Sequence, residues 1–286
     1  MTTGEAYIDF VKEIKVVYEE REAETISDWV FENVTGMKRW ERRANQNKEL
    51  KNDDYQQLQK YLKELLQHKP VQYVLSEAWF YKMKFFVDEN VLIPRSETEE
   101  LVEWVISDFK NQNSSKPTNI IDIGSGSGCI SIALKNELTE INVTAIDISK
   151  KALAVAELNA QRLKAQVHFF EINFLKESEW RSLPIYDSII SNPPYIPIIE
   201  KEVLSKNVTE FEPKVALFVE NNDPVIFYKK IATFAKDHLK KEGKIYVETH
   251  EEYAKEVKDV FENAGYLAEI KKDIYGKERM VRGKKV

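Results

Sequence analysis

The sequence predicts an α/β fold, a doubly wound parallel sheet, preceded by a small helical domain. From about residue 119 onward, short apolar runs alternate with segments of helical periodicity, as in the strand–helix units of a parallel sheet. A glycine-rich loop at 124–128 joins the first predicted strand to a helix, and the tetrapeptide Asn192-Pro193-Pro194-Tyr195 follows a later strand. Both features lie at the carboxyl ends of strands, where open α/β sheets bind their ligands.

The composition narrows the class of protein. A chain of 286 residues with 43% hydrophobic and 31% charged residues can form one large or two moderate domains. The net charge of −6 argues against stable nucleic-acid binding, which depends on clustered Lys and Arg. The short basic stretch 277–285 is expected to be a solvated end.

Metal sites, disulfide bonds and membrane-spanning segments are not expected. Cys129 is the single cysteine, so neither an intrachain disulfide nor a cysteine metal cluster can form, and we expect it to be a small core residue. The four histidines have no ligand spacing. The acidic N-terminus and the lack of a long apolar segment predict a cytoplasmic protein. The sequence leaves the oligomeric state open, and a monomer is the simplest expectation.

Residues 1–75 are predicted to form a helical domain. Apolar side chains recur there at three- and four-residue spacing, which is typical of amphipathic helices. The predicted helices begin near Tyr7, Ala23 and Asn52. No catalytic constellation occurs among them, so the domain is either a structural cap or a docking surface for a protein partner.

Residues 76–92 are predicted to link the two domains. The aromatic runs 78–81 and 84–87 are rich in residues that favour strands, which indicates a hairpin that turns at Lys82-Met83.

Residues 93–286 form the second predicted domain. Its first helix begins at Ser96, and 111–118 is a polar loop. Buried strands are expected at 119–123, 142–146, 167–170, 186–191 and 244–248, with a closing pair at 267–274 and 279–282. After the helix that follows the glycine loop, further helices are expected at 149–163, 223–239 and 252–264.

The loop Gly124-Ser125-Gly126-Ser127-Gly128 is the first candidate binding element. Its glycines allow a tight turn and a close approach of the backbone to a ligand. Asp147 ends the next strand, about twenty residues on, where a carboxylate suits the ribose hydroxyls of a nucleoside cofactor. NAD and S-adenosylmethionine both fit this pattern. Asp122 and the Gly-x-Gly-x-Gly spacing favour S-adenosylmethionine, which would leave as S-adenosylhomocysteine.

Asn173 and Phe174 follow the third strand and are expected beside the adenine of this cofactor. Asn173 could hydrogen-bond to the edge of the base, and Phe174 could pack on its face. The alternative is a loop asparagine and a core phenylalanine.

The tetrapeptide Asn192-Pro193-Pro194-Tyr195 is the candidate catalytic element. Two prolines cannot continue a strand ladder, so the chain leaves the sheet at Asn192 in an extended, stiff conformation. The Asn192 side-chain oxygen and the Pro193 carbonyl can accept both N–H bonds of an amide or aromatic amine, which turns the nitrogen lone pair toward a methyl donor. Tyr195 can stack on the planar group. No general base is required, because the methylated nitrogen loses its proton readily to water.

The chain resembles the HemK/PrmC-type protein-(glutamine-N5) methyltransferases that modify peptide-chain release factors. The resemblance runs from about Pro70 to the C-terminus. Its motifs are Pro70-Val71-Gln72-Tyr73, Phe85-Phe86-Val87, Leu92-Ile93-Pro94-Arg95 with Glu97-Thr98-Glu99, the Asp122 glycine loop, Asn192-Pro193-Pro194-Tyr195 and Phe211-Glu212-Pro213. Adenine-N6 methyltransferases share the Pro-Pro-Tyr signature, so the stretch 94–99 together with 70–73 is more specific.

The resemblance implies a class I S-adenosylmethionine-dependent methyltransferase domain with a mostly parallel seven-stranded sheet. It also implies methyl transfer to the glutamine of the Gly-Gly-Gln motif in class 1 release factors. The implied cofactor contacts are Gly124, Ser125, Gly126, Ser127, Gly128, Asp147, Asn173, Phe174 and Asn192. The implied substrate contacts are Asn192, Pro193, Pro194 and Tyr195, of which Asn192, Pro193 and Tyr195 are catalytic.

The chain departs from the family pattern at three places, and alternatives remain open. Ser96 stands where proline is common, Asn173 where aspartate is usual, and Val219-Glu220 where glycines often occur; Asn173 bears on the predicted adenine contact. A DNA or RNA amino-methyltransferase would use the same catalytic residues, although a basic groove laced with aromatic residues is lacking. A non-catalytic binder or a dinucleotide enzyme is the third interpretation.

Overall fold

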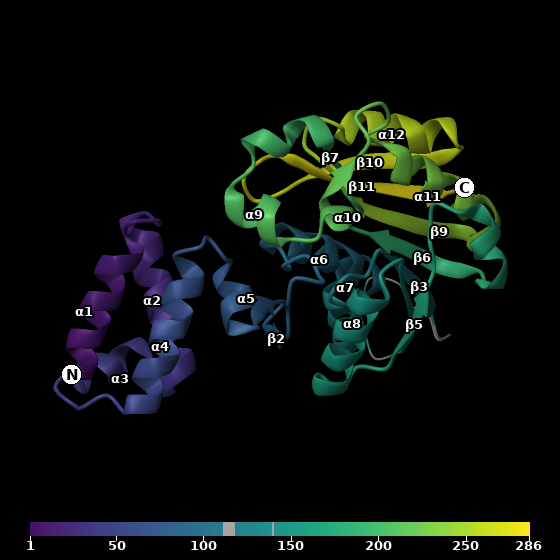
Figure 1. Cartoon of the computed structure of the whole chain (residues 1–286). Helices are drawn as coiled ribbons and strands as arrows, with labels where there is room; N and C mark the ends of the chain where they lie inside the picture. The colour runs from purple at the N-terminus through teal and green to yellow at the C-terminus, as the bar shows by residue number, and fades with distance from the viewer. Residues whose placement is uncertain (111–117, 139) are drawn as a thin grey trace. The chain divides into compact units, whose positions relative to one another are not determined.

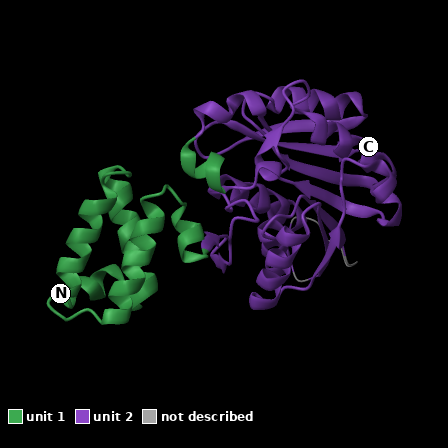
Figure 2. Ribbon diagram, in the orientation of Figure 1, with its two compact units in different colours: residues 1–77, 205–211 green, residues 78–204, 212–286 purple. Residues whose placement is uncertain are grey.

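The computed structural model describes residues 1–110, 118–138 and 140–286, which form two compact units. Unit 1 comprises residues 1–77 and 205–211, and unit 2 comprises residues 78–204 and 212–286 (Figure 2). The polar loop expected at 111–118 lies outside the described residues, except for Thr118.

Unit 1 is a helical bundle. Its helices are α1 (Thr3–Ile14), α2 (Glu20–Thr35), α3 (Arg39–Ala44), α4 (Asn52–Leu65), α5 (Val71–Leu75) and the later segment α9 (Lys206–Phe211). Apolar side chains from α1, α2, α4 and α5, among them Ile14, Phe31 and Leu58, form its core. The predicted helices are present, whereas α3 and α5 are too short to produce a periodic pattern and were missed.

A β-hairpin opens unit 2, as the aromatic runs predicted. Strands β1 (Ala78–Phe80) and β2 (Met83–Phe85) pair antiparallel (Figure 1). The turn was predicted one residue too late: it lies at Tyr81-Lys82, where both residues have positive φ values, 47° and 64°. Two-residue hairpin turns of this kind require positive φ at both central positions, which matches the twist of the strands.

The core of unit 2 is a seven-stranded sheet with the order β10-β11-β9-β6-β3-β4-β5. Its strands are β3 (Thr118–Ile123), β4 (Ile141–Asp147), β5 (Val167–Glu171), β6 (Tyr186–Ser191), β9 (Leu239–Glu248), β10 (Tyr266–Lys272) and β11 (Glu278–Lys285). Strands β3, β4, β5, β6 and β9 are parallel, and β11 runs antiparallel to both of its neighbours. The mostly parallel, seven-stranded sheet predicted from the sequence is confirmed.

The prediction of a solvated end at 277–285 is wrong, because most of this stretch is strand β11 between β9 and β10. The closing pair of strands expected at 267–274 and 279–282 is present as β10 and β11. Met280, Val281 and Gly283 are buried in this strand. The charged side chains between them form ion pairs, including Arg282 with Asp108 and Lys284 with Glu242. The charge of this stretch was therefore a poor guide to its structure. The charged ends of lysine and arginine side chains can stay solvated or paired while the backbone is hydrogen-bonded within a sheet.

Helices cover both faces of the sheet (Figure 1). They are α6 (Ser96–Lys110), α7 (Cys129–Glu137), α8 (Lys150–Arg162), α11 (Ile226–His238) and α12 (Ala254–Asn263). Successive strand residues point to opposite faces: Ile189 and Ile245 pack in the core with α11 and α12, whereas Ile190 and Tyr246 pack in the core with α6 and α7. This two-sided burial explains the continuous apolar strands in the sequence.

The segment after β6 contains short elements that the sequence did not reveal. They are β7 (Ile196–Pro197), η2 (Ile198–Val203), α10 (Lys214–Leu217) and β8 (Phe218–Val219), while η1 (Glu177–Ser182) precedes β6. Strands β7 and β8 pair parallel, so the chain returns close to the end of the tetrapeptide. This return places α10 at the candidate site.

Candidate active site

A pocket of about 150 Å³ opens at the carboxyl ends of β3, β4 and β6 in unit 2. Of the residues singled out in the sequence, those that line it are Gly124, Gly126, Asp147, Asn173, Phe174, Asn192, Pro193 and Pro194. Apolar side chains that the sequence did not single out as site residues complete the wall: Leu92, Val215 and Phe227. The structure thus brings segments that are far apart in the chain to one apolar cavity with a few polar groups, which is typical of a small-molecule site.

The glycine loop is held in a conformation that other residues rarely adopt. Gly124 and Gly126 have φ values of 76° and 52°, and a Cβ added to either would meet no atom within 4 Å. Side chains at these positions would therefore strain the backbone and fill the open space over the loop. Gly128 matters for helix packing instead, because an added Cβ would lie 3.1 Å from Cβ of Ala156. This glycine therefore allows α7 and α8 to pack closely.

Asp147 ties the glycine loop to the end of β4. One carboxylate oxygen accepts a hydrogen bond from the backbone N–H of Gly126 at 2.9 Å, and the other accepts one from Ser149, also at 2.9 Å. Burial raises the pKa of Asp147, while these backbone hydrogen bonds act in the opposite direction. Each oxygen keeps a further acceptor site, so the carboxylate can still receive hydroxyl donors, as the ribose prediction requires.

Unpaired polar atoms lie buried beside the loop. Asp122 is fully buried, and its Oδ2 accepts a 2.5 Å hydrogen bond from Ser131, whereas its Oδ1 has no partner. Burial raises the pKa of Asp122 to about 7. The hydroxyl of Ser125 is likewise buried without a partner. Buried polar groups are normally hydrogen-bonded. Together with the open space over Gly124 and Gly126, these atoms fit a polar cofactor that carries its own donors.

Asn173 and Phe174 both line the pocket but differ in the contacts that hold their side chains. The Asn173 side-chain oxygen accepts a hydrogen bond from the backbone of Leu175 at 3.1 Å, which makes a local turn. Phe174 is also a core residue, stacked on Trp180 at 5.1 Å. Trp180 in turn donates to the Phe174 carbonyl at 2.9 Å. Phe174 therefore combines the two roles that the sequence left open, wall and core.

The tetrapeptide leaves the sheet directly after Ser191, whose hydroxyl donates to the carbonyl of Ile123 at 2.7 Å. This bond ties β6 to β3 at the point where the glycine loop begins. Asn192 follows, half-buried in the pocket wall, and its amide Nδ2 donates to the hydroxyl of Thr98 at 3.0 Å. Pro193 is buried and Pro194 is half-buried. The prolines thus fix the direction in which Asn192 faces the pocket.

Tyr195 is not among the residues that line the pocket. Its hydroxyl donates to Oε1 of Glu248 at 3.2 Å, and its ring centroid lies 6.2 Å from that of His250. Burial, with the nearby Glu248 charge, raises the pKa of Tyr195 well above its usual value, so the hydroxyl stays protonated. The stacking role expected for Tyr195 remains a prediction.

The structure adds functional candidates that the sequence reasoning did not assign. Thr98 was named as part of a helix start and of a family motif, but not as a site residue, although its side chain contacts Asn192. Glu248 ends a buried strand, as Asp147 does, and this shared position was the available signal. Glu212 is almost fully buried, where it pairs with Arg95 at 2.5 Å and accepts from the N–H of Ile93 at 3.2 Å. It therefore fixes the loop that carries Leu92.

A clustered metal site and a membrane-spanning helix are both absent from the part of the chain that the structure describes. Within residues 1–110, 118–138 and 140–286, no group of three or more His, Cys, Asp or Glu side chains could hold a metal ion. No helix of these ranges is both long and apolar enough to span a membrane.

Comparisons with known proteins identify the family. Residues 6–75 match the family described as the PrmC N-terminal domain, and residues 102–210 match the Methyltransferase small domain. A methyltransferase structure from Pyrococcus furiosus shares the fold, with a TM-score of 0.50 at 16% identity over 70% of this chain and 88% of that chain.

Curated relatives give the closer likeness. A release factor glutamine methyltransferase of Flavobacterium psychrophilum is 40% identical over 274 residues, covering 96% of this chain and 95% of the relative. Another from Leptospira interrogans is 42% identical over 219 residues, covering 75% of this chain and 74% of the relative. The chain therefore belongs to the family of release factor glutamine methyltransferases, the HemK/PrmC type.

Proposed function

We propose that this protein transfers a methyl group from S-adenosylmethionine to the side-chain amide nitrogen of the glutamine in the Gly-Gly-Gln motif of class 1 release factors. One observation carries the proposal: Asn192 and Pro193 line the same pocket as Gly124, Gly126 and Asp147. The family and the curated relatives support the choice of substrate.

The cofactor would be held by groups that the chain supplies at the strand ends. Gly124 to Gly128 and Asp147 offer backbone N–H groups and a carboxylate, and Asn173 with Phe174 offers an amide and an aromatic wall. When bound, S-adenosylmethionine supplies an electrophilic methyl group on a positively charged sulfur. The apolar wall formed by Leu92, Val215 and Phe227 would exclude water, which would otherwise compete with a weak nucleophile.

The chain's own contribution to the transfer is orientation of the amide nitrogen. An amide nitrogen is a poor nucleophile because its lone pair is delocalised. The side-chain oxygen of Asn192 and the carbonyl of Pro193 would each accept one N–H of the glutamine, which turns the lone pair toward the methyl group. The nitrogen proton is then lost to water after transfer, and no general base from the chain is needed.

The first domain and the cellular setting complete the proposal. Residues 1–75 would dock the release factor, residues 76–92 would link the domains, and residues 93–286 would carry out the transfer. Residues 1–75 carry two exposed tryptophans, Trp29 (48% exposed) and Trp40 (67% exposed), which are anchors of the kind found at protein interfaces. We further propose that the enzyme is a cytoplasmic monomer that binds no nucleic acid stably.

An assay with labelled methyl donor tests the proposal. The protein is incubated with either a class 1 release factor or DNA and RNA, and a calorimetric titration compares S-adenosylhomocysteine with NAD. We expect label in the release factor but not in DNA or RNA, and binding of S-adenosylhomocysteine but not of NAD. Label in nucleic acid alone would replace the proposal with an amino-methyltransferase of nucleic acids, and preferential binding of NAD would indicate a dinucleotide enzyme.

A further inference from the structure

A hydrogen-bonded chain of buried side chains lies behind the carboxamide of Asn192. Nδ2 of Asn192 donates to Oγ1 of Thr98 at 3.0 Å, and that hydroxyl donates to Oε2 of Glu248 at 2.6 Å. Thr98 is 2% exposed and Glu248 is 1% exposed. The three residues come from the end of β6, the first turn of α6 and the end of β9, so only the folded sheet brings them together.

The register of the sheet explains why Glu248 and Asn192 meet. Strands β6 and β9 are parallel neighbours, and Ser191 pairs with Val247. Asn192 and Glu248 are the next residues along the chain, so Asn192 directly follows β6 and Glu248 ends β9. Thr98 in the first turn of α6 bridges them.

The direction of the hydrogen bonds fixes the orientation of the amide. An ionised carboxylate only accepts hydrogen bonds, and a threonine hydroxyl has one proton to give. Because Thr98 gives its proton to Glu248, it presents only lone pairs to Asn192. The NH2 end of the Asn192 side chain must then face Thr98, and its oxygen must face the other way. Without such a chain, the two ends of a carboxamide can exchange places at little cost.

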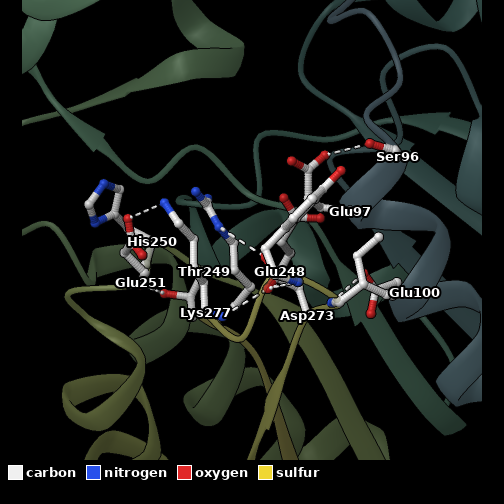
Figure 3. A network of polar contacts seen from close by, with 12 residues as sticks. Ser96, Glu97, Glu100, Glu248, Thr249, His250, Glu251, Asp273 and Lys277 are labelled. Carbon is white, nitrogen blue, oxygen red and sulfur yellow. Dashed lines mark hydrogen bonds and ion pairs between the residues drawn. The ribbon is translucent and has the colours of Figure 1, made fainter.

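Glu248 is itself held on several sides. Its second oxygen accepts from Tyr195 at 3.2 Å, and its backbone carbonyl accepts from the hydroxyl of Tyr228 at 2.9 Å. Burial raises the pKa of Glu248, and the hydrogen bonds from Thr98 and Tyr195 and the charge of Arg279 oppose this effect. Figure 3 shows Glu248 in a network of polar side chains from the first turn of α6 and the turn between β10 and β11, including Glu97 and Lys277.

We propose that Thr98 and Glu248 are positioning residues that set the polarity of the Asn192 carboxamide, so that its oxygen accepts a hydrogen bond from the substrate NH2 group. A reversed carboxamide would present its own NH2 to the substrate NH2, and two donors repel. The same Glu248 carboxylate fixes Tyr195, so one buried group orients both polar side chains of the tetrapeptide. This inference rests on the proposed function for its chemical meaning, although the polarity itself is a property of the protein alone.

Variants at Thr98 separate the hydroxyl from the packing. Thr98→Val keeps the shape and removes the hydroxyl, Thr98→Ser keeps the hydroxyl, and Thr233→Val repeats the same exchange on α11, where the hydroxyl donates to the Lys229 carbonyl. We expect Thr98→Val to lower kcat on the order of tenfold or more, with little change in the KM for S-adenosylmethionine. Thr98→Ser should keep most of the activity, and Thr233→Val should match the wild type.

A spectroscopic readout tests the polarity without any substrate. In protein labelled with 15N-asparagine and bound to S-adenosylhomocysteine, the side-chain amide signals of Asn192 are assigned by their loss in Asn192→Asp. We expect one of the two amide protons in the wild type and in Thr98→Ser to exchange slowly with water, and this protection to disappear in Thr98→Val.

The outcomes separate the two proposals. Unprotected Asn192 amide protons in the wild type would overturn the positioning role, and this result does not depend on the folding of any variant. Equal kcat for Thr98→Val and the wild type would overturn it as well. Protected amide protons in an enzyme that fails to methylate release factors would sustain the polarity and refute the proposed function instead.

Discussion

At the scale of single residues, the sequence identified the polar groups of the pocket but not their supports. Asn192 and Asp147 are recognisable because each follows a buried strand, and glycines at 124 and 126 stand out by type. Thr98 and Glu248 lie 94 and 150 positions from their hydrogen-bond partners, Asn192 and Thr98 respectively. Contacts across such separations depend on sheet order and register, which local patterns do not encode.

Substituting Asn192 with alanine should remove most methyl transfer while leaving binding of S-adenosylhomocysteine nearly intact. The variant loses one of two acceptors that orient the nucleophile, and the loss of one oriented catalytic contact lowers kcat about 100-fold or more. Turnover and a calorimetric titration measure the two effects. Asn142→Ala, which removes a surface amide paired with Asn119, is the control. Similar turnover in the two variants would refute the orienting role.

Asp122 should make stability depend on pH. Its folded-state pKa is raised to about 7 from an ordinary 3.8, so between these values the folded protein holds a proton that the unfolded chain has lost. Stability from this group is therefore lost as pH rises through the window. From pH 5 to pH 8, the stability of Asp122→Asn relative to the wild type should increase by about 2.7 kcal/mol, since each of the two pH units between pH 5 and the folded-state pKa is worth about 1.36 kcal/mol.

Chemical denaturation of the cofactor-free protein at several pH values measures the effect of Asp122. Asp9→Asn, which makes the same exchange at an exposed position, is the control. A stability difference between Asp122→Asn and the wild type that stays constant with pH would contradict the buried, proton-binding carboxyl.

At the scale of elements, long strands and helices were predictable and short connections were not. Strand β6 lies where the apolar run placed it, at Tyr186–Ser191, because both of its faces are buried. The short pair β7 and β8 has two residues in each strand, too few for any periodicity. The hairpin was recognisable, but its turn shifted by one residue because Tyr81 and Lys82 adopt positive φ despite their side chains.

Gly128→Ala tests the close approach of α7 and α8. Gly128 and Gly265 both have positive φ, 79° and 91°, but an added Cβ meets a neighbour within 4 Å only at Gly128. Gly128→Ala and Gly265→Ala both strain the backbone. Gly128→Ala should lower the free energy of unfolding by about 1–2 kcal/mol more than Gly265→Ala, because the core must also shift to admit a methyl group. Thermal unfolding measures the difference. Equal losses of stability would show that packing against Ala156 does not require glycine.

Lys285 shows how β11 supports a neighbouring helix. Its amine donates to the carbonyls of Ala235, Lys236 and Leu239, at 3.0, 2.7 and 2.7 Å, and so caps the C-terminal end of α11. Lys285→Met should lower stability by about 1–2 kcal/mol, because these carbonyls lose a charged donor. Lys284→Met removes a neighbouring lysine that pairs with exposed Glu242 and should change stability little. Denaturant titration of both variants decides whether this cap stabilises the fold.

At the scale of the whole molecule, fold class, family and the closing pair of strands followed from the sequence, whereas the solvated end expected at 277–285 was wrong. Alternating strands and helices predicted the parallel sheet, and the combination of glycine loop and tetrapeptide pointed to methyl transfer. The charge of residues 277–285 suggested a solvated tail, yet β11 lies inside the sheet. Net composition describes the surface of a protein, and strand pairing is decided by the backbone and by the buried side chains.

The central claim is that this protein methylates a neutral glutamine amide of a release factor, which Asn192 and Pro193 orient for the transfer. Mass spectrometry of a class 1 release factor after incubation with this enzyme and S-adenosylmethionine tests the claim most directly. We predict the added mass of one methyl group on the glutamine of the Gly-Gly-Gln loop, and none when this glutamine is replaced by alanine. Methylation of another residue, or unchanged methylation of the alanine variant, would contradict it.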